Sequence, residues 1–355
     1  MKSKQKQERH HNRTIAVLTI IFISLAAVGI WQGYRLYFSN LTSRDGEAHR
    51  IYIYPETTIS TLLDTLTAHY QIASPLCLRL HARMMSYPAK GQQYTRTGSY
   101  IVPAKCGDKE LIQMFRNGWQ TPVKVSFRNI RTQAQLSARL ASQLMLDSAD
   151  IASRLGDKDY MKQFDLTIPT AVCLFLPDTY EMYWDITPDR LFQRMYKEYS
   201  TFWTEERQAK ASALHLKPWE VATIASIVEE ETNRDEDKPV IAGLYLNRLR
   251  IGMPLQSCPT LKFALQDFTL RRILNKHLET DSPYNTYRNA GLPPGPIRIP
   301  TAKTMDYVLN PVKSNYLFMC ASTAFDGTHH FSATYREHAA YARQYHQALD
   351  KRGIK

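Results

Sequence analysis

IASIVEEETNRDEDKPVIAGLYLNRLRIGMPLQSCPT, residues 224–260, is the stretch that decides the fold of this 355-residue chain. Its first part continues a helix that we expect over residues 219–232, because apolar residues recur there at the helical period. Four of them share one face: Val221, Ile224, Ala225 and Val228. The last turn of this helix carries three consecutive glutamates.

The three glutamates are predicted to have different surroundings, because each helical residue is rotated from the one before it. Glu231 falls within about 20° of Ile224, beside the apolar face, whereas Glu230 points directly away from that face and Glu229 lies at one edge. Burial disfavours the charged form of a carboxylate, so its pKa rises and it can act as a general acid near neutral pH. The competing interpretation is a solvated run of charge that closes the helix.

A second helix is expected after a polar loop, with Asp237 and Pro239 as its start signals. Its apolar positions are Val240, Ile241, Leu244, Tyr245 and Leu249. Arg248 lies inside that apolar arc, where an unpaired guanidinium would be costly. We therefore expect it to have a carboxylate or carbonyl partner, and a structural salt bridge in preference to substrate contact. Residues 252–254 (GMP) should end the helix, and residues 255–260 should continue as extended chain.

Two later loops are rich in proline, glycine and aromatic residues, namely 282–287 (SPYNTY) and 291–297 (GLPPGPI). Such loops can wall a carbohydrate cleft, because aromatic faces pack on sugar rings while amides bond to hydroxyls.

At this point the chain resembles the endolytic murein transglycosylase family (MltG, YceG-like) in an ordered set of segments. The matching segments are 175–180 (FLPDTY), 225–232 (ASIVEEET), 241–253 (IAGLYLNRLRIGM), 284–287 (YNTY), 291–297 (GLPPGPI), 327–332 (GTHHFS) and 337–338 (EH). Two positions depart from the family pattern. Cys258 stands where the family usually has Asp, which puts any role of that Asp in doubt, and Ala339 stands where it usually has Asn.

The resemblance implies a cofactor-free and metal-free lytic transglycosylase whose essential glutamate maps onto Glu231. That residue would protonate the oxygen between N-acetylmuramic acid and N-acetylglucosamine, then accept the proton of the muramic C6 hydroxyl, leaving a 1,6-anhydro end. Substrate binding is expected of Gln256, Tyr284, Asn285, Thr286 and Tyr287. Supporting roles are expected of Glu229, Asn247, Arg248 and His329. For the individual substrate-binding candidates, loop stiffening is an equal alternative, and Glu229 is expected to pair with Arg248 or a lysine.

The N-terminus predicts a membrane anchor. Residues 1–14 are strongly basic and residues 15–31 are uncharged, a length at the short end of what spans a bilayer. Basic residues before the apolar run place the N-terminus in the cytoplasm and the remainder outside it. The resemblance implies that the membrane is the inner membrane and that the remainder lies in the periplasm. Tyr34 and Tyr37 would be interfacial anchors. The alternative is a signal peptide cleaved near Ser24–Ala27.

The net charge of +12 belongs partly to that basic tail, and the rest suits an anionic membrane surface or an acidic polymer. Nucleic acid is excluded as a partner because no nucleic-acid-binding motif occurs and the body is expected outside the cytoplasm. The resemblance implies peptidoglycan strands as partner, together with peptidoglycan synthases and elongation or division proteins. Five scattered cysteines exclude a full disulfide framework; buried free thiols are expected, and Cys77–Cys106 is the most plausible single bond.

We predict an α+β fold with one transmembrane helix, a small LysM-like module and a mixed catalytic domain. The expected boundaries are a basic tail 1–14, an anchor 15–35, a linker 36–49, the LysM-like module 50–105, the catalytic domain 106–347 and a tail 348–355. The prediction of this module rests on a strand–helix–helix–strand order whose last strand is Gly98–Val102. It resembles the module that precedes the catalytic domain in the family, and glycan binding and structural packing are equal alternatives for it.

Two other functions compete with the transglycosylase. The first is a non-catalytic, membrane-anchored glycan-binding scaffold, for which Cys258 is the one sequence hint. The second is a metal hydrolase built on His329, His330, His338 and Glu337. Adjacent histidines cannot easily bind one ion, and no His-Glu-x-x-His helix occurs. We instead expect His329 in a hairpin that pairs residues 316–320 with 329–333 across Asp326-Gly327.

Overall fold

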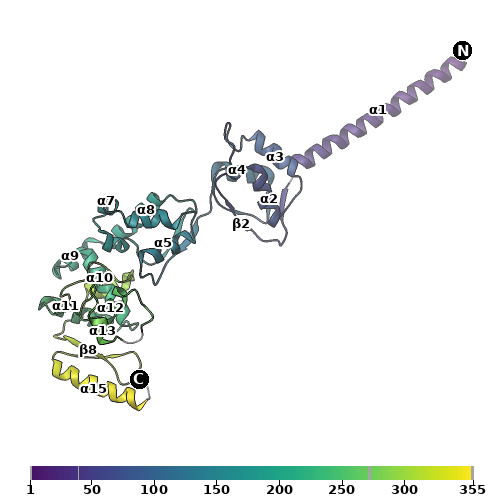
Figure 1. The fold of residues 1–355 in the computed structure, drawn as a ribbon. Helices are drawn as coiled ribbons and strands as arrows, with labels where there is room; N and C mark the ends of the chain where they lie inside the picture. The colour runs from purple at the N-terminus through teal and green to yellow at the C-terminus, as the bar shows by residue number, and fades with distance from the viewer. Residues whose placement is uncertain (1, 39, 271–272, 353–355) are drawn as a thin grey trace. The chain divides into compact units, whose positions relative to one another are not determined.

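The computed structural model describes residues 2–38, 40–270 and 273–352, without the side chains of residues 2–14 and 35–37. The basic side chains of the predicted tail, the predicted anchor Tyr37, Ser39 of the predicted linker and residues 353–355 therefore lie outside the described part. The chain folds into two compact units (Figure 1). Unit 1 comprises residues 1–123 and 182–185, and unit 2 comprises residues 124–181 and 186–355.

Helices dominate, and short strands make up the rest of a mixed α+β fold, as predicted. The helices of unit 1 are α1 (Lys2–Tyr37), α2 (Ile59–His69), α3 (Pro75–Met84) and α4 (Asp108–Asn117). The helices of unit 2 are α5 (Gln133–Ala141), α6 (Ser148–Leu155), α7 (Lys158–Lys162), the 3-10 helix η1 (Ile168–Leu174), α8 (Pro188–Phe202), α9 (Glu205–Ala213), α10 (Pro218–Glu231), α11 (Lys238–Arg250), α12 (Cys258–Ala264), α13 (Asn275–Leu278), α14 (Ala302–Leu309) and α15 (Tyr335–Lys351). The strands are β1 (Asn40–Ser43), β2 (His49–Ile53), β3 (Tyr70–Ile72), β4 (Gly98–Val102), β5 (Lys105–Gly107), β6 (Val123–Ser126), β7 (Thr179–Met182), β8 (Phe318–Ala321) and β9 (His329–Ser332).

Helix α1 contains an apolar segment, Ile15–Tyr34, that is long and apolar enough to cross a membrane. Every side chain of this segment is exposed in the protein. Trp31 and Tyr34 lie at its C-terminal end, where aromatic residues commonly meet the lipid headgroups. The same segment would also serve as a signal sequence.

The predicted strands and helices of unit 1 are β2, α2, α3 and β4, and a further short strand, β3, lies between the two helices. β2 and β4 pair antiparallel, with Ile51 opposite Tyr100. The buried hydroxyl of Tyr70 fastens this pair, because it accepts a hydrogen bond from the His49 amide at 3.0 Å and donates one to the Val102 carbonyl at 2.6 Å. Helix α2 begins at a Thr58 cap, whose hydroxyl accepts a hydrogen bond from the Thr61 amide at 3.3 Å.

The predicted linker 36–49 is wrong over much of its length. Asn40–Ser43 forms β1, which is the middle strand of an antiparallel sheet ordered β3–β1–β5. Leu41 is completely buried in the core of unit 1. The segment is too short and too polar for its alternation to stand out in the sequence, so its pairing comes from partners that lie far along the chain.

Unit 2 is organised around α10, whose residues from Val221 to Val228 are all buried. Helices α9, α11, α12 and α14 and the 3-10 helix η1 contact it on different sides. One buried polar group in this helix, the Ser226 hydroxyl, accepts a hydrogen bond from the Ile297 amide at 3.0 Å. The loop 291–297 therefore packs on the back of α10, and its expected role as a cleft wall is not what the structure shows.

Helix α11 matches its prediction and ends at the expected Gly-Met-Pro turn. Gly252 adopts φ +68°, a left-handed conformation that favours glycine after a helix. The predicted extended chain is wrong beyond Ser257, because α12 begins at Cys258 with Pro259 in its first turn. This change of direction aims Ser257 back toward the end of α10.

The predicted hairpin is confirmed, with strands slightly shorter than expected. β8 and β9 pair antiparallel, and Cys320 lies opposite His330. All five cysteines are free, so the Cys77–Cys106 bond is not formed. Cys77, Cys106 and Cys173 are buried thiols.

Candidate active site

Glu231 ends α10 and accepts two short hydrogen bonds on the same carboxylate oxygen. The Tyr245 hydroxyl of α11 donates to Oε1 at 2.6 Å, and the Ser257 hydroxyl donates to Oε1 at 2.6 Å. The structure shows no hydrogen bond to Oε2 among the described residues. Oε1 is therefore held, and Oε2 is the oxygen available to a ligand.

A buried loop contact positions the Ser257 hydroxyl. The Ser257 amide donates to Thr286 Oγ1 at 3.0 Å, and the Gln256 amide donates to the Thr286 carbonyl at 3.0 Å. Gln256 adopts φ +49°, an uncommon conformation for a residue other than glycine. The turn at Gln256 thus lets two successive amides bind one threonine while the Ser257 side chain faces Glu231.

Burial is the largest influence on Glu231 and raises its pKa above the ordinary value. The hydrogen bonds from Ser257 and Tyr245 act in the opposite direction, as do the charges of His329 and Arg248, and they do not cancel the effect of burial. Burial and the neighbouring Glu231 also raise the pKa of Tyr245 well above its ordinary value, so that residue remains a donor. The predicted acid therefore has the environment that a general acid requires.

Two cavities share Glu231, Ala321 and His329 as lining residues. The first, of about 410 Å³, is also lined by Arg248, Gln256, Cys258 and Tyr287. The second, of about 500 Å³, extends along Asn233, Arg234, Ser322 and the turn at Asp326–Thr328. Glu231 thus stands where the two cavities meet, so a long ligand can extend to both sides of its carboxyl group.

His329 is fixed beside this junction by Asp237. Its Nδ1 lies 2.9 Å from Asp237 Oδ2, and both side chains are mostly buried. The contact joins β9 to the start of α11, and it leaves the other ring nitrogen of His329 for the cavities. His329 therefore lies beside Glu231 in both cavities, and the supporting role predicted for it stays a prediction.

The predicted substrate-binding residues divide into two groups. Gln256 and Tyr287 line the first cavity. Asn285 is completely buried and donates to the Leu278 and Thr280 carbonyls at 2.9 and 2.8 Å. Thr286 is also buried, in the loop contact described above. Tyr284 lines neither cavity and packs against Phe263.

The contacts of Asn285 and Thr286 are those of the loop-stiffening alternative, and the substrate-binding role predicted for these residues and for Tyr284 stays a prediction. The physical reason is local: an asparagine amide that satisfies two carbonyls stabilises a tight loop, and a sequence pattern does not distinguish this from an amide that faces a ligand.

Arg248 has carbonyl partners, and the salt bridge expected for it is wrong. Its Nε donates to the Leu317 carbonyl at 2.6 Å and its Nη1 to the Leu255 carbonyl at 2.7 Å. It therefore ties the loop before Ser257 to the start of the β8–β9 hairpin. Asn247 has a similar role, because it donates to the Ser314 and Tyr316 carbonyls at 2.8 and 3.1 Å.

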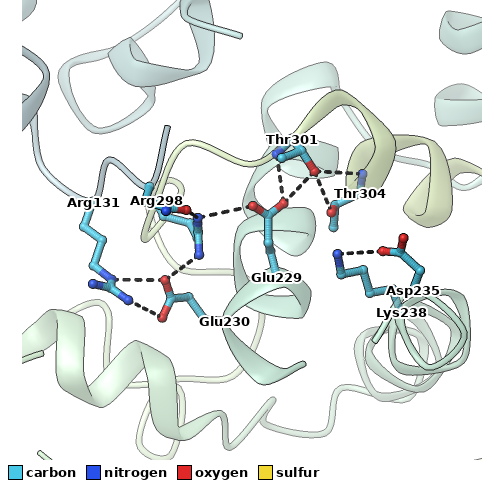
Figure 2. Close-up of polar contacts among 9 residues, drawn as sticks. Arg131, Glu229, Glu230, Asp235, Lys238, Arg298, Thr301 and Thr304 are labelled. Carbon is cyan, nitrogen blue, oxygen red and sulfur yellow. Dashed lines mark hydrogen bonds and ion pairs between the residues drawn. The ribbon is translucent and has the colours of Figure 1, made fainter. Parts of the chain in front are cut away.

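The partner predicted for Glu229 is wrong, and Glu230 is bound by two arginines. Figure 2 shows Arg298 between the two carboxylates, 3.3 Å from Glu229 Oε1 and 2.9 Å from Glu230 Oε1. Glu229 also accepts hydrogen bonds from the amide and hydroxyl of Thr301, at 2.8 and 2.9 Å. Arg131 binds both oxygens of Glu230 at 3.0 Å. Glu230 thus faces these two arginines, and Glu229 pairs with Arg298 instead of Arg248 or a lysine.

The four residues of the alternative metal site are engaged separately. His329 pairs with Asp237, His330 stacks on Tyr341, His338 stacks on Phe318, and Glu337 caps α15 through Thr334. Among residues 2–38, 40–270 and 273–352, no group of three or more His, Cys, Asp and Glu residues is placed to hold a metal ion.

Sequence reasoning missed Tyr245 and Ser257. The apolar arc predicted for α11 includes Tyr245, and a buried tyrosine still needs a partner for its hydroxyl. Since α10 and α11 are joined by a short loop and pack together, the nearest acid at the end of α10 was a signal for that partner. Ser257 carried no comparable signal, because only the turn into α12 directs it toward Glu231.

The fold and the site define an α+β protein built around a partly buried glutamic acid at the junction of two cavities. The chain belongs to the YceG-like family, whose model matches residues 51–344. It is similar to the endolytic murein transglycosylase of Bacillus subtilis strain 168, with 29% identity over 226 residues that cover 59% of this chain and 62% of that protein.

Two further proteins are similar to the chain. The endolytic murein transglycosylase of Streptococcus pneumoniae D39 is 23% identical over 366 aligned residues, covering 92% of this chain and 64% of that protein. A crystal structure of a yceG-like protein from Listeria monocytogenes is 25% identical, with a TM-score of 0.55, covering 83% of this chain and 98% of that one. The chain thus spans a little under two thirds of the length of the named transglycosylases.

Proposed function

We propose that this protein is a lytic transglycosylase that cleaves the N-acetylmuramic acid–N-acetylglucosamine bond within nascent peptidoglycan strands and leaves 1,6-anhydromuramic ends. The names of its relatives support the substrate class. The observation that carries the proposal is the carboxyl group of Glu231, which has a raised pKa, one oxygen held and one oxygen free, at the junction of two cavities.

The number of carboxylates supports a lyase over a hydrolase. Glycoside hydrolysis ordinarily uses two carboxyl groups on either side of the scissile bond. Glu231 is the one acidic residue among those that line the first cavity. The second cavity adds Asp326, whose exposed carboxylate accepts hydrogen bonds from the amide and hydroxyl of Thr328. An intramolecular attack by the C6 hydroxyl needs a single group that first gives and then takes a proton.

In the proposed reaction, Oε2 of protonated Glu231 donates its proton to the bridging oxygen as the bond from that oxygen to C1 breaks. The N-acetylglucosamine part leaves with the proton as its hydroxyl. Oε2 of the resulting carboxylate then removes the proton of the C6 hydroxyl while that oxygen bonds to C1. Glu231 ends protonated as it began, and no water is consumed. Throughout, Tyr245 and Ser257 hold Oε1, which fixes Oε2 as the reacting oxygen.

Gln256 and Tyr287 are the residues best placed to contact the sugar beside Glu231, since both line the first cavity. An amide side chain can bond to an acetamido group, and an aromatic ring can pack on a sugar face. Cleavage inside a strand, as opposed to at its end, is favoured by cavities on both sides of Glu231. Setting where nascent strands terminate would follow from such cleavage.

The proposed organisation has α1 as an uncleaved single-pass anchor in the inner membrane, with the N-terminus in the cytoplasm and both units in the periplasm. Residues 50–105 would belong to the LysM-like module, which as unit 1 continues to residue 123, and unit 2 would be the catalytic domain. Peptidoglycan synthases and elongation or division proteins are the partners that such a location implies.

The test is mass spectrometry of the muropeptides released when the full chain, in detergent, is incubated with purified peptidoglycan. We expect products that carry 1,6-anhydromuramic ends, and internal fragments of several disaccharides early in the reaction. Reducing ends would mean that water is the acceptor, and Asp326 would then be the second carboxylate to examine. Retained binding without any product would support a non-catalytic glycan-binding scaffold.

Replacing Tyr245 with phenylalanine is expected to shift the alkaline limb of the kcat/KM profile to higher pH. The hydroxyl stabilises the carboxylate form of Glu231, so its loss raises the pKa of that residue further and keeps the acid form to higher pH. We also expect kcat to fall roughly tenfold at the optimum, since a hydrogen bond to a charged group contributes about 1.5 kcal/mol. Ser257→Ala should shift the limb the same way. Tyr183→Phe, at an exposed tyrosine, is the matched control and should leave the profile unchanged. A shift of the alkaline limb of Tyr245→Phe to lower pH would contradict the prediction.

A further inference from the structure

Helix α3 of unit 1 exposes an apolar row that the proposed reaction does not use. Leu76, Leu80 and Met84 are 77%, 52% and 61% exposed, and their spacing of four residues places them on one side of the helix. The opposite side is buried in the core through Cys77, Leu78, His81 and Ala82. Three large apolar side chains in a row on a short helix are more than scattered surface exposure would explain.

A basic row runs beside the apolar one. Arg79 and Arg83 are exposed and lie next to Leu76 and Leu80 when the helix is stepped at its period. The surrounding sequence is free of acidic residues: between Asp64 and Asp108 there are five lysines and arginines and no aspartate or glutamate. An exposed helix face that combines apolar and basic side chains is the pattern of a helix that lies on an anionic lipid surface.

Backbone pairing places the start of α3 close to the end of α1. The Ala73 amide, two residues before α3, donates to the Asn40 carbonyl at 3.2 Å, and β1 pairs with β3 directly beside it. Asn40 is three residues after Tyr37, where α1 ends. With at most about 3.8 Å per chain step, the first turn of α3 lies within roughly 30 Å of the end of the apolar segment, whatever the angle between α1 and the sheet.

We propose that the face of α3 formed by Leu76, Arg79, Leu80, Arg83 and Met84 docks on the anionic headgroups of the membrane that holds α1. The proposal rests on the membrane anchoring given under the proposed function. In this arrangement the apolar row enters the boundary between headgroups and acyl chains, and the two arginines bind lipid phosphates. Unit 1 is then held against the bilayer by two contacts, α1 and α3, and any glycan-binding face of the module lies elsewhere on it.

The experiment uses the full chain, reconstituted into nanodiscs of phosphatidylglycerol or of phosphatidylcholine, with a photocrosslinking phenylalanine analogue at position 80. The control carries the same analogue at Ile101, an exposed apolar residue of β4 in the same unit. Mass spectrometry of the irradiated protein measures lipid adducts. In phosphatidylglycerol nanodiscs we expect about fivefold more lipid adduct from position 80 than from position 101. The adduct from position 80 should be lower in phosphatidylcholine nanodiscs. It should also be clearly lower in a variant that combines Arg79→Glu and Arg83→Glu. Both labelled positions are exposed, and thermal unfolding of each variant checks that it remains folded.

Three outcomes would overturn the proposal. Equal lipid adducts from positions 80 and 101 would show mere proximity to the bilayer. Adducts with glycan in place of lipid, when purified peptidoglycan is added, would assign the face to the substrate. Adducts with another copy of the chain would assign it to self-association. Flotation with vesicles tests the anchor separately: a chain that floats without lipid adducts at position 80 retains its anchor and refutes the docking face.

Discussion

Glu231→Gln is expected to lower the rate of glycan cleavage by about 10²–10⁴-fold, the contribution typical of a general acid–base residue. Glutamine cannot give a proton to the bridging oxygen, nor take one from the C6 hydroxyl. Its amide oxygen can still accept the hydrogen bonds of Tyr245 and Ser257, so the site should keep its shape. The measurement is the initial rate of anhydromuropeptide release by the full chain, with substrate binding followed separately. Binding should change little, so the loss should be in kcat.

The same variant should reveal the raised pKa of Glu231 as a dependence of stability on pH. A carboxyl group whose folded-state pKa is raised contributes stability fully below its unfolded value, here about 4.5, and loses that contribution as pH rises through the folded value. The native protein should therefore lose stability relative to Glu231→Gln as pH increases. We expect the Tm of the variant minus that of the native protein to be greater at pH 8 than at pH 4.

Glu236→Gln is the matched control for both measurements, since Glu236 is an exposed acid five residues beyond Glu231. It should leave the rate and the pH dependence unchanged. A Glu231→Gln protein that remained active while Glu229→Gln was inactive would show that the wrong glutamate has been assigned. If the Tm of Glu231→Gln minus that of the native protein decreased as pH increases, the raised pKa of Glu231 would be contradicted.

Local pattern was sufficient to predict the two helices that carry the site. The apolar period, the prolines near each start and the Gly-Met-Pro turn are signals within a few residues of the ends that they mark, and α10 and α11 begin and end close to the predicted residues. The hairpin β8–β9 was predicted for the same reason. Glu231 was placed beside apolar neighbours by the helical period alone, and its pKa is raised by burial.

What the pattern could not supply was contact between distant parts of the chain. A helical wheel describes a single helix and therefore predicted no partner for Glu230, whereas Arg131 lies 99 residues before Glu230 and Arg298 lies 68 residues after it. Asn285 was expected to face a substrate because its motif is polar and aromatic, and whether an amide faces a ligand or its own loop depends on the path of the backbone. Ser257 was overlooked because its direction is set by the start of α12.

Arg298→Met is expected to be the most destabilising substitution in unit 2 outside the apolar core. Arg298 is 11% exposed and lies between Glu229 and Glu230, whose side chains are 9% and 15% exposed. It also donates to the Asn129 side chain at 2.8 Å (Figure 2 shows its two carboxylate partners). Removing one partner of a buried ion pair leaves an uncompensated charge and costs about 3–5 kcal/mol. For a unit of this size that corresponds to a Tm lower by roughly 10 °C.

Arg131→Met provides the matched comparison, because it removes an arginine from the same cluster with less burial. Arg131 is 35% exposed, and after its loss Glu230 would still be bound by Arg298. We therefore expect a decrease in Tm well under half of that caused by Arg298→Met, measured by calorimetry of the full chain. Arg298→Lys should recover only part of the loss, since a single ammonium group cannot bond to Glu229, Glu230 and Asn129 in the fixed geometry of a guanidinium. Equal effects of Arg131→Met and Arg298→Met would mean that the cluster is solvated and that the last turn of α10, which carries Glu231, is held by its apolar contacts instead.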